Sequence, residues 1–134
     1  MIESTKVILA EDVCLDSTTN RISAFNLIES ISTNTIPSII PNIAFICFWE
    51  RKPEDVASIH GIFTVSLNDE KILSHSVIVD FNENLMNRSI YRLNGIMIKK
   101  PGKMTFSVIL ENKASAKTEI NIIVADGVDK SHAS

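Results

Sequence analysis

Two adjacent carboxylates, Glu11 and Asp12, are the residues of this 134-residue chain that are best suited to acid–base chemistry. They interrupt an alternating apolar segment, 6–15, which is typical of a β-strand. Because consecutive side chains of a strand point to opposite faces, one carboxylate should face the apolar side, where it needs a partner. The pair therefore predicts an acidic site in a cleft or a structural role, which is either an edge strand with an inward charge or an ion pair with Arg21 or Arg51. We favour the structural role.

Histidines are the other candidates for proton transfer or metal binding. His60 and His75 lie in two segments that we expect to pair across the turn at 68–70, so they are candidates for neighbours. Two histidines and a carboxylate could bind a metal, but no H-x-H or HExxH spacing is present. We favour ordinary strand histidines, and we expect no metal and no cofactor. His132 belongs to the polar tail.

Nucleophile and phosphate-binding motifs are absent from the sequence. There is no G-x-S-x-G, and the four glycines are isolated. Cys14 and Cys47 lack the flanking residues of catalytic cysteines, and we expect two small buried thiols within strands. The sequence therefore predicts a protein that is not an enzyme. A hydrolase that uses Glu11 or Asp12 with His60 or His75 is the remote alternative.

Aromatic side chains form the candidate interaction surface. Phe48 and Trp49 are consecutive, so they point to opposite faces of a strand, and at least one should cover an outer surface. Together with Tyr91 they could contact a protein or a sugar. The segment 43–51 that carries them is apolar on both sides, which suits a central strand covered on both faces or one with a partner on its outer face.

The elements that must position these residues are β-strands, because apolar residues recur at every second position along the chain. Turn-forming residues separate the alternating segments. A Pro-Gly pair at 101–102 predicts a hairpin, with a solvated cluster of lysines at its tip. Gly61 and Gly95 are candidate β-bulges. We expect eight strands, at 6–15, 22–31, 43–51, 56–67, 71–81, 88–98, 103–112 and 117–125, and a crossover at 32–42 with a short helical turn at 38–40.

Eight such strands predict an all-β fold, an antiparallel sandwich of two sheets. The length suits one domain, at 1–125, followed by a frayed tail at 126–134. The net charge of -3 and the absence of basic blocks argue against nucleic acid as a partner. No apolar run is long enough to span a membrane, and no secretory signal pattern is present, so we expect a cytoplasmic protein.

Three segments carry a resemblance to a known group of proteins. They are the opening Val7-Ile8-Leu9-Ala10-Glu11-Asp12-Val13 with its following turn, the crossover from Pro37 to Pro41, and Leu93-x-Gly95-Ile96 followed by Pro101-Gly102-x-x-x-Phe106-x-Val108-x-Leu110. The chain resembles a family of small uncharacterised bacterial proteins, a domain of unknown function. The resemblance implies an immunoglobulin-like β-sandwich, and it transfers no activity or site residue.

These observations favour a non-catalytic protein-interaction or assembly module, with another protein or a second copy of the chain as its partner. Open sheet edges and the two-sided apolar segment motivate this hypothesis. The alternative is a module that binds a small ligand or a carbohydrate, which requires a concave pocket with exposed aromatic rings.

Overall fold

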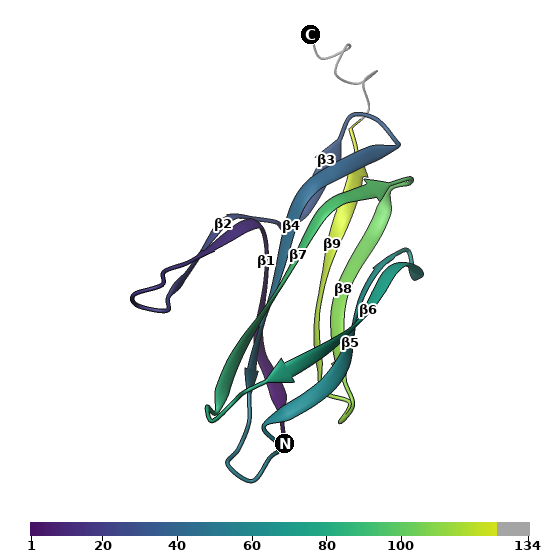
Figure 1. Ribbon diagram of the computed structural model, residues 1–134. Coiled ribbons are helices and arrows are strands. Elements are labelled where there is room, and N and C mark those ends of the chain that lie inside the picture. The colour runs from purple at the N-terminus through teal and green to yellow at the C-terminus, as the bar shows by residue number, and fades with distance from the viewer. Residues whose placement is uncertain (126–134) are drawn as a thin grey trace.

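Two β-sheets pack face to face in the computed structural model, which describes residues 1–125 (Figure 1). The tail expected at 126–134 lies outside the described residues. The described strands are β1 (Glu3–Leu15), β2 (Ile22–Leu27), β3 (Ser30–Thr33), β4 (Ser38–Glu50), β5 (Ser58–Leu67), β6 (Glu70–Asp80), β7 (Met86–Ile98), β8 (Gly102–Leu110) and β9 (Ser115–Val124).

The smaller sheet has the strand order β2-β1-β4-β7, and the larger one has the order β3-β9-β8-β5-β6. Neighbouring strands are antiparallel, except that β3 and β9 are parallel. No helix that could span a membrane occurs in residues 1–125. The predicted all-β architecture of two packed sheets is confirmed, with one strand more than expected.

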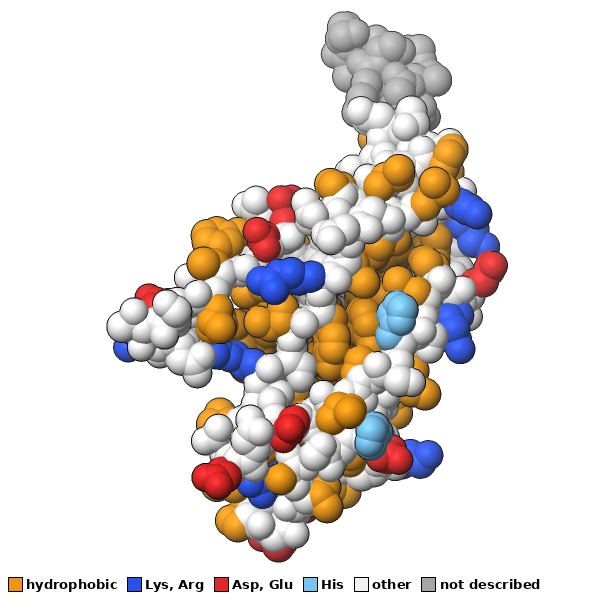
Figure 2. Space-filling model, in the orientation of Figure 1, with side chains coloured by type: hydrophobic (Ala, Val, Ile, Leu, Met, Phe, Trp, Pro, Cys, Tyr) orange, Lys and Arg blue, Asp and Glu red, His pale blue; other side chains and the backbone are white. Residues whose placement is uncertain are grey.

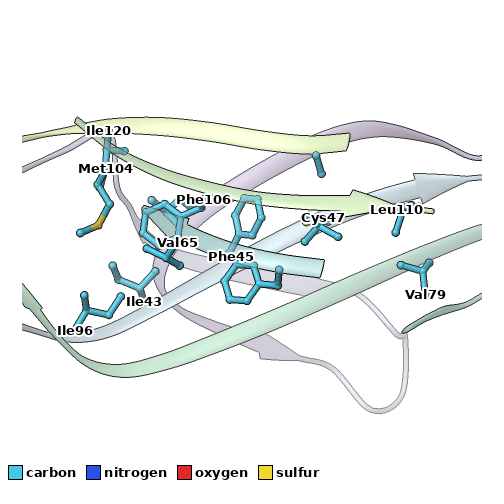
Figure 3. Packing of buried hydrophobic residues seen from close by; sticks show 14 of the residues in the cluster. Ile43, Phe45, Cys47, Val65, Val79, Ile96, Met104, Phe106, Leu110 and Ile120 are labelled. Atoms are coloured by element: carbon cyan, nitrogen blue, oxygen red, sulfur yellow. The ribbon is translucent and has the colours of Figure 1, made fainter. Parts of the chain in front are cut away.

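The core lies between the two sheets, where alternate side chains of both layers meet. Phe45 of β4 and Phe106 of β8 face each other there, with ring centroids 6.0 Å apart (Figure 3). Buried apolar side chains at every second position provide most of the favourable free energy of such a fold. The largest fully buried members are Trp49, Phe45, Phe63, Phe81, Phe106, Ile2, Ile43, Ile46, Ile98, Met104, Leu110 and Val65.

A second apolar cluster covers the outer face of β4. Ala44 and Ile46 point outward, and Val13 of the β1–β2 hairpin packs against them, flanked by partly buried apolar side chains. Arg92 fixes this arrangement by donating a hydrogen bond from its guanidinium to the Val13 carbonyl oxygen, at 2.9 Å. The apolar outer side of β4 is therefore covered by the chain's own hairpin, as expected of a strand buried on both faces.

Three local predictions differ from the structure. The single strand expected at 22–31 divides into β2 and β3, because the chain passes from one sheet to the other at Ile28–Glu29. The expected helical turn at 38–40 is the start of β4. The Pro-Gly turn at 101–102 joins β7 to β8, which belong to different sheets, so it reverses the chain without forming a hairpin.

Neither glycine marks a register shift. Gly61 is buried, and a Cβ there would lie 2.7 Å from Cδ2 of Leu110, so its role is to allow close approach of β8. Gly95 has a φ of +77°, which favours glycine. Leu93 before it and Ile96 after it both point toward the core, although they are three residues apart. The inward-facing positions of β7 therefore shift by one residue at Gly95, while the pairing register with β4 stays the same.

Candidate interaction site

The two candidate acids, Glu11 and Asp12, are both exposed. They lie where β1 leaves β4 to form the hairpin with β2, so neither carboxylate is forced into the core. Oε2 of Glu11 accepts a hydrogen bond from the Asn26 side chain at 3.1 Å, beside a shallow groove of about 450 Å³. Asp12 lies 4.0 Å from Nε of Arg92, so its basic neighbour is neither Arg21 nor Arg51.

The histidines are not neighbours. In the register of β5 and β6, His60 is opposite Ile78, and His75 is opposite Phe63. Phe63 is buried, so His75 points toward the interlayer side, whereas His60 lies on the outer face. Within residues 1–125, no group of three histidine, cysteine or acidic side chains is arranged to hold a metal ion.

The two thiols differ in burial. Cys47 is buried in the core, as predicted, and burial raises its pKa to about 12. Cys14 is exposed, which corrects the prediction, because it lies on the outer face of the hairpin after β1 has left β4. Both are free thiols.

The three aromatic residues of the predicted surface have different environments. Trp49 is only 1% exposed, because its position on β4 points into the core, so it contributes no accessible ring. Phe48 points outward and is half-buried, with the ammonium of Lys6 5.2 Å from its ring centroid. Both residues border an open groove of about 560 Å³. Tyr91 of β7 is half-buried at the edge of the core.

Tyr91 lies beside an opening between the two layers. β6 is the last strand of the larger sheet and β7 the last of the smaller one, and both outer edges are unpaired. The two strands diverge from their short connection (Figure 1). Figure 2 shows hydrophobic side chains in a hollow between the layers on this side of the molecule. We call this the β6–β7 opening, defined by Leu73, His75 and Val77 of β6 and by Tyr91 and Leu93 of β7.

Apolar side chains of both edge strands reach this opening. Leu73, Val77, Tyr91 and Leu93 pack against the main core and are only partly buried. The Tyr91 ring stacks on Phe63, with centroids 4.8 Å apart and planes 14° from parallel. Its hydroxyl oxygen is buried and makes no well-formed hydrogen bond, and burial raises its pKa, although the nearby Ser89 side chain opposes this rise.

Both ends of the β6–β7 opening are closed. At one end, the Asn87 side chain donates a hydrogen bond to the Asp80 carbonyl oxygen at 2.7 Å, across the β6–β7 connection. At the other end, Asn68 joins the β5–β6 turn to the β7–β8 turn. Its side chain donates to the Pro101 carbonyl oxygen at 3.1 Å and accepts from the Lys103 amide at 2.9 Å.

A pocket of about 260 Å³ lies next to this second closure. Leu67, Ile72 and Met97 line it with apolar atoms. Its remaining lining residues are Glu70, Lys71, Lys99 and Lys100. Nζ of Lys100 is 3.2 Å from Oε2 of Glu70, so one lysine is neutralised by the single acid. We call this the lysine pocket.

The sequence indicated part of this site. Tyr91 belongs to the predicted aromatic surface, and the lysine cluster that was predicted to be solvated at the 101–102 turn includes Lys99 and Lys100 of the pocket. Leu73, Val77 and Leu93 were missed as site residues, because alternation shows that they face a core and does not show where that core is open. Strand order decides this, and no local residue pattern specifies strand order.

Comparison with known proteins gives a family and no function. A model of DUF6941, a family of unknown function, matches residues 6–123. No curated protein matches the chain. The matched segment contains every described strand except the ends of β1 and β9, and it includes all residues of the β6–β7 opening and the lysine pocket. The chain therefore belongs to the DUF6941 family.

Proposed function

We propose that the protein is a non-catalytic interaction module that binds an extended segment of a partner protein in the β6–β7 opening. The observation that supports this most directly is the coincidence of two unpaired strand edges with half-buried apolar side chains on the same side of the sandwich. A bound segment in strand conformation uses both, since its backbone pairs with an edge and its alternate side chains enter the opening.

The edge of β6 is the preferred acceptor in this proposal. Its inward positions Leu73, His75 and Val77 provide a row of three side chains that alternates with the small polar residues Ser74 and Ser76. Small residues leave the edge accessible to an incoming backbone. β7 is less regular, because Gly95 changes the phase of its side chains.

On the opposite side of the sandwich the two layers are in contact, and the edge strands β2 and β3 end their sheets there. There β1 lies against β9, and the Ile28 amide donates to the Leu9 carbonyl oxygen at 2.8 Å. Natural β-proteins cover or charge their exposed edges, because unpaired edges recruit other strands. Because β2 and β3 are short, with six and four residues, the longer edges of β6 and β7 are the favoured place for a partner.

A peptide that tests this proposal is a nine-residue alternation of valine and threonine, with a fluorophore at its N-terminus and an amide at its C-terminus. We expect saturable binding by fluorescence anisotropy. The same peptide N-methylated at every second residue keeps its side chains and loses backbone donors, so it should bind at least about tenfold more weakly. Absence of binding at millimolar protein, or equal affinity of the two peptides, would contradict the proposal.

A matched pair of protein variants locates the binding. His75 and His60 are both exposed residues of the β5–β6 pair, on opposite faces. His75→Glu places a charge in the opening and should weaken binding about tenfold, since a desolvated charge opposes apolar burial. His60→Glu places the same charge on the outer face and should leave binding unchanged. Equal weakening by both variants would place the peptide elsewhere.

A further inference from the structure

We infer that the segment bound in the β6–β7 opening ends at the lysine pocket, where its C-terminal carboxylate is held between Lys71 and Lys99. This inference rests on the proposed function and specifies the chemistry of the partner. It follows from the direction of β6, the closed end of the opening and the charges of the pocket.

Strand direction places a C-terminus at this end. β6 starts next to the lysine pocket, at Glu70, and runs away from it toward Asp80. A segment that pairs antiparallel with β6 therefore runs toward the pocket. Antiparallel pairing is slightly more stable per residue than parallel pairing, which favours this direction over a parallel addition to β6, which would run away from the pocket.

The end of the opening prevents the segment from continuing straight on. Asn68 connects the two turns that border the pocket, through one hydrogen bond to Pro101 and one from Lys103. Asn68 also lies against Gly102, where a Cβ would overlap its side chain, so the two turns are in close contact. A bound segment that reaches this barrier has its last residue in the pocket.

The pocket offers the chemistry for that last residue. Leu67, Ile72 and Met97 can contact an apolar side chain. Lys71 and Lys99 have no acidic partner in the described part of the chain, whereas Lys100 is paired with Glu70. Three lysines and one glutamate leave a local excess of positive charge on a protein whose net charge is -3. An apolar residue with a free carboxylate complements both features.

Three peptides test the inference in one anisotropy experiment. They share the valine–threonine sequence and end in a free carboxylate, in an amide, or in a glutamate followed by an amide. We expect the free carboxylate to bind about five- to tenfold more tightly than the amide at low ionic strength. At about 0.5 M salt the two affinities should become nearly equal, because salt screens the attraction between the lysines and the carboxylate. The glutamate peptide should bind like the amide, because its charge lies on a side chain beyond the backbone terminus.

Charge-matched variants assign the preference to the pocket. Lys71→Gln/Lys99→Gln should lower the affinity for the free-carboxylate peptide to that for the amide peptide. The control Lys52→Gln/Lys113→Gln removes two exposed lysines elsewhere and should retain the preference for the free carboxylate. Equal binding of carboxylate and amide peptides, or equal effects of the two double variants, would overturn the inference while the proposed function stands. If none of the peptides binds, both are wrong.

Discussion

Phe63 and Tyr91 stack across the two layers, with ring centroids 4.8 Å apart and planes 14° from parallel. Phe63 belongs to β5 of the larger sheet, and Tyr91 belongs to the edge strand β7 of the smaller one. Phe45 extends the row, because its ring stacks on Phe63 at 5.9 Å. This row connects the center of the core to the β6–β7 opening, so Tyr91 is both a core residue and a residue of the proposed site.

Removing the buried Tyr91 hydroxyl should change the free energy of unfolding. A buried polar group without a hydrogen bond costs roughly 1–3 kcal/mol, so Tyr91→Phe should raise the free energy of unfolding by about 1 kcal/mol. Tyr91→Ala removes the stacked ring and should lower it by about 2–3 kcal/mol. Urea denaturation measures both. A loss of stability in Tyr91→Phe would mean that the hydroxyl has a partner in solution.

The pH dependence of Tyr91 has a definite sign. Burial raises the pKa of its hydroxyl in the folded protein, whereas in the unfolded chain it ionises near its ordinary value of about 10. The contribution to stability is therefore fully present below pH 10 and is lost as the pH rises through the folded pKa. Tyr91→Phe should lose less stability than the native chain in this alkaline range, as measured by urea denaturation at a series of pH values.

Cys47 should produce a second alkaline loss of stability. Its thiol has a pKa of about 12 in the folded protein, against 9.0 ordinarily. The unfolded chain releases this proton first, so the free energy of unfolding falls between pH 9 and 12, by up to about 1.4 kcal/mol per pH unit. Cys47→Ala should show a shallower slope, whatever its stability at pH 7. Cys14→Ser changes an exposed thiol and should keep the native slope, so equal slopes in the two variants would contradict this assignment.

Most strands could be predicted from the sequence because burial follows alternation in them. Phe63, Val65 and Leu67 are buried, and Thr64 and Ser66 between them are half-buried, as the pattern of this segment requires. Prediction was wrong at the places where the chain changes sheets. A single strand is expected at 22–31 although the alternation breaks at Leu27-Ile28, and the segment divides at Ile28–Glu29 because each half pairs with a different neighbour.

The candidate site was less predictable than the fold, because it depends on strand order. Trp49 was placed among the surface aromatics although it is the inward residue of its pair with Phe48. The sequence shows that the two side chains point in opposite directions, and only packing decides which direction is inside. One carboxylate of Glu11 and Asp12 was expected to face the core. Both are exposed instead, because β1 stops pairing with β4 at Ala10 and continues into the hairpin with β2.

Two arginines of β7 should control the mobility of the β1–β2 hairpin. Arg92 donates to the Val13 carbonyl oxygen, and Arg88 donates to the Asn20 carbonyl oxygen at 2.8 Å. Arg88→Ala/Arg92→Ala should therefore speed amide hydrogen exchange in residues 12–25, while exchange in β5 and β8 stays slow. Arg21→Ala removes an exposed arginine of the same hairpin and serves as the control. Uniform acceleration over all strands would indicate general destabilisation instead.

Gly61 should tolerate no side chain, because β5 and β8 approach each other too closely there. An added Cβ would lie 2.7 Å from Cδ2 of Leu110 and 2.9 Å from the carbonyl oxygen of Ile109. The backbone oxygen has little freedom to move, so Gly61→Ala should lower the free energy of unfolding by about 1–3 kcal/mol. Gly95 provides the comparison, since a Cβ there meets nothing within 4 Å but its φ of +77° is unfavourable for alanine. Gly95→Asn should restore part of the loss in Gly95→Ala, because asparagine adopts this backbone region more readily. If the cause at Gly61 is steric, Gly61→Asn should lower the free energy of unfolding at least as much as Gly61→Ala does. Chemical denaturation of the four variants distinguishes this steric cause from the conformational cause at Gly95.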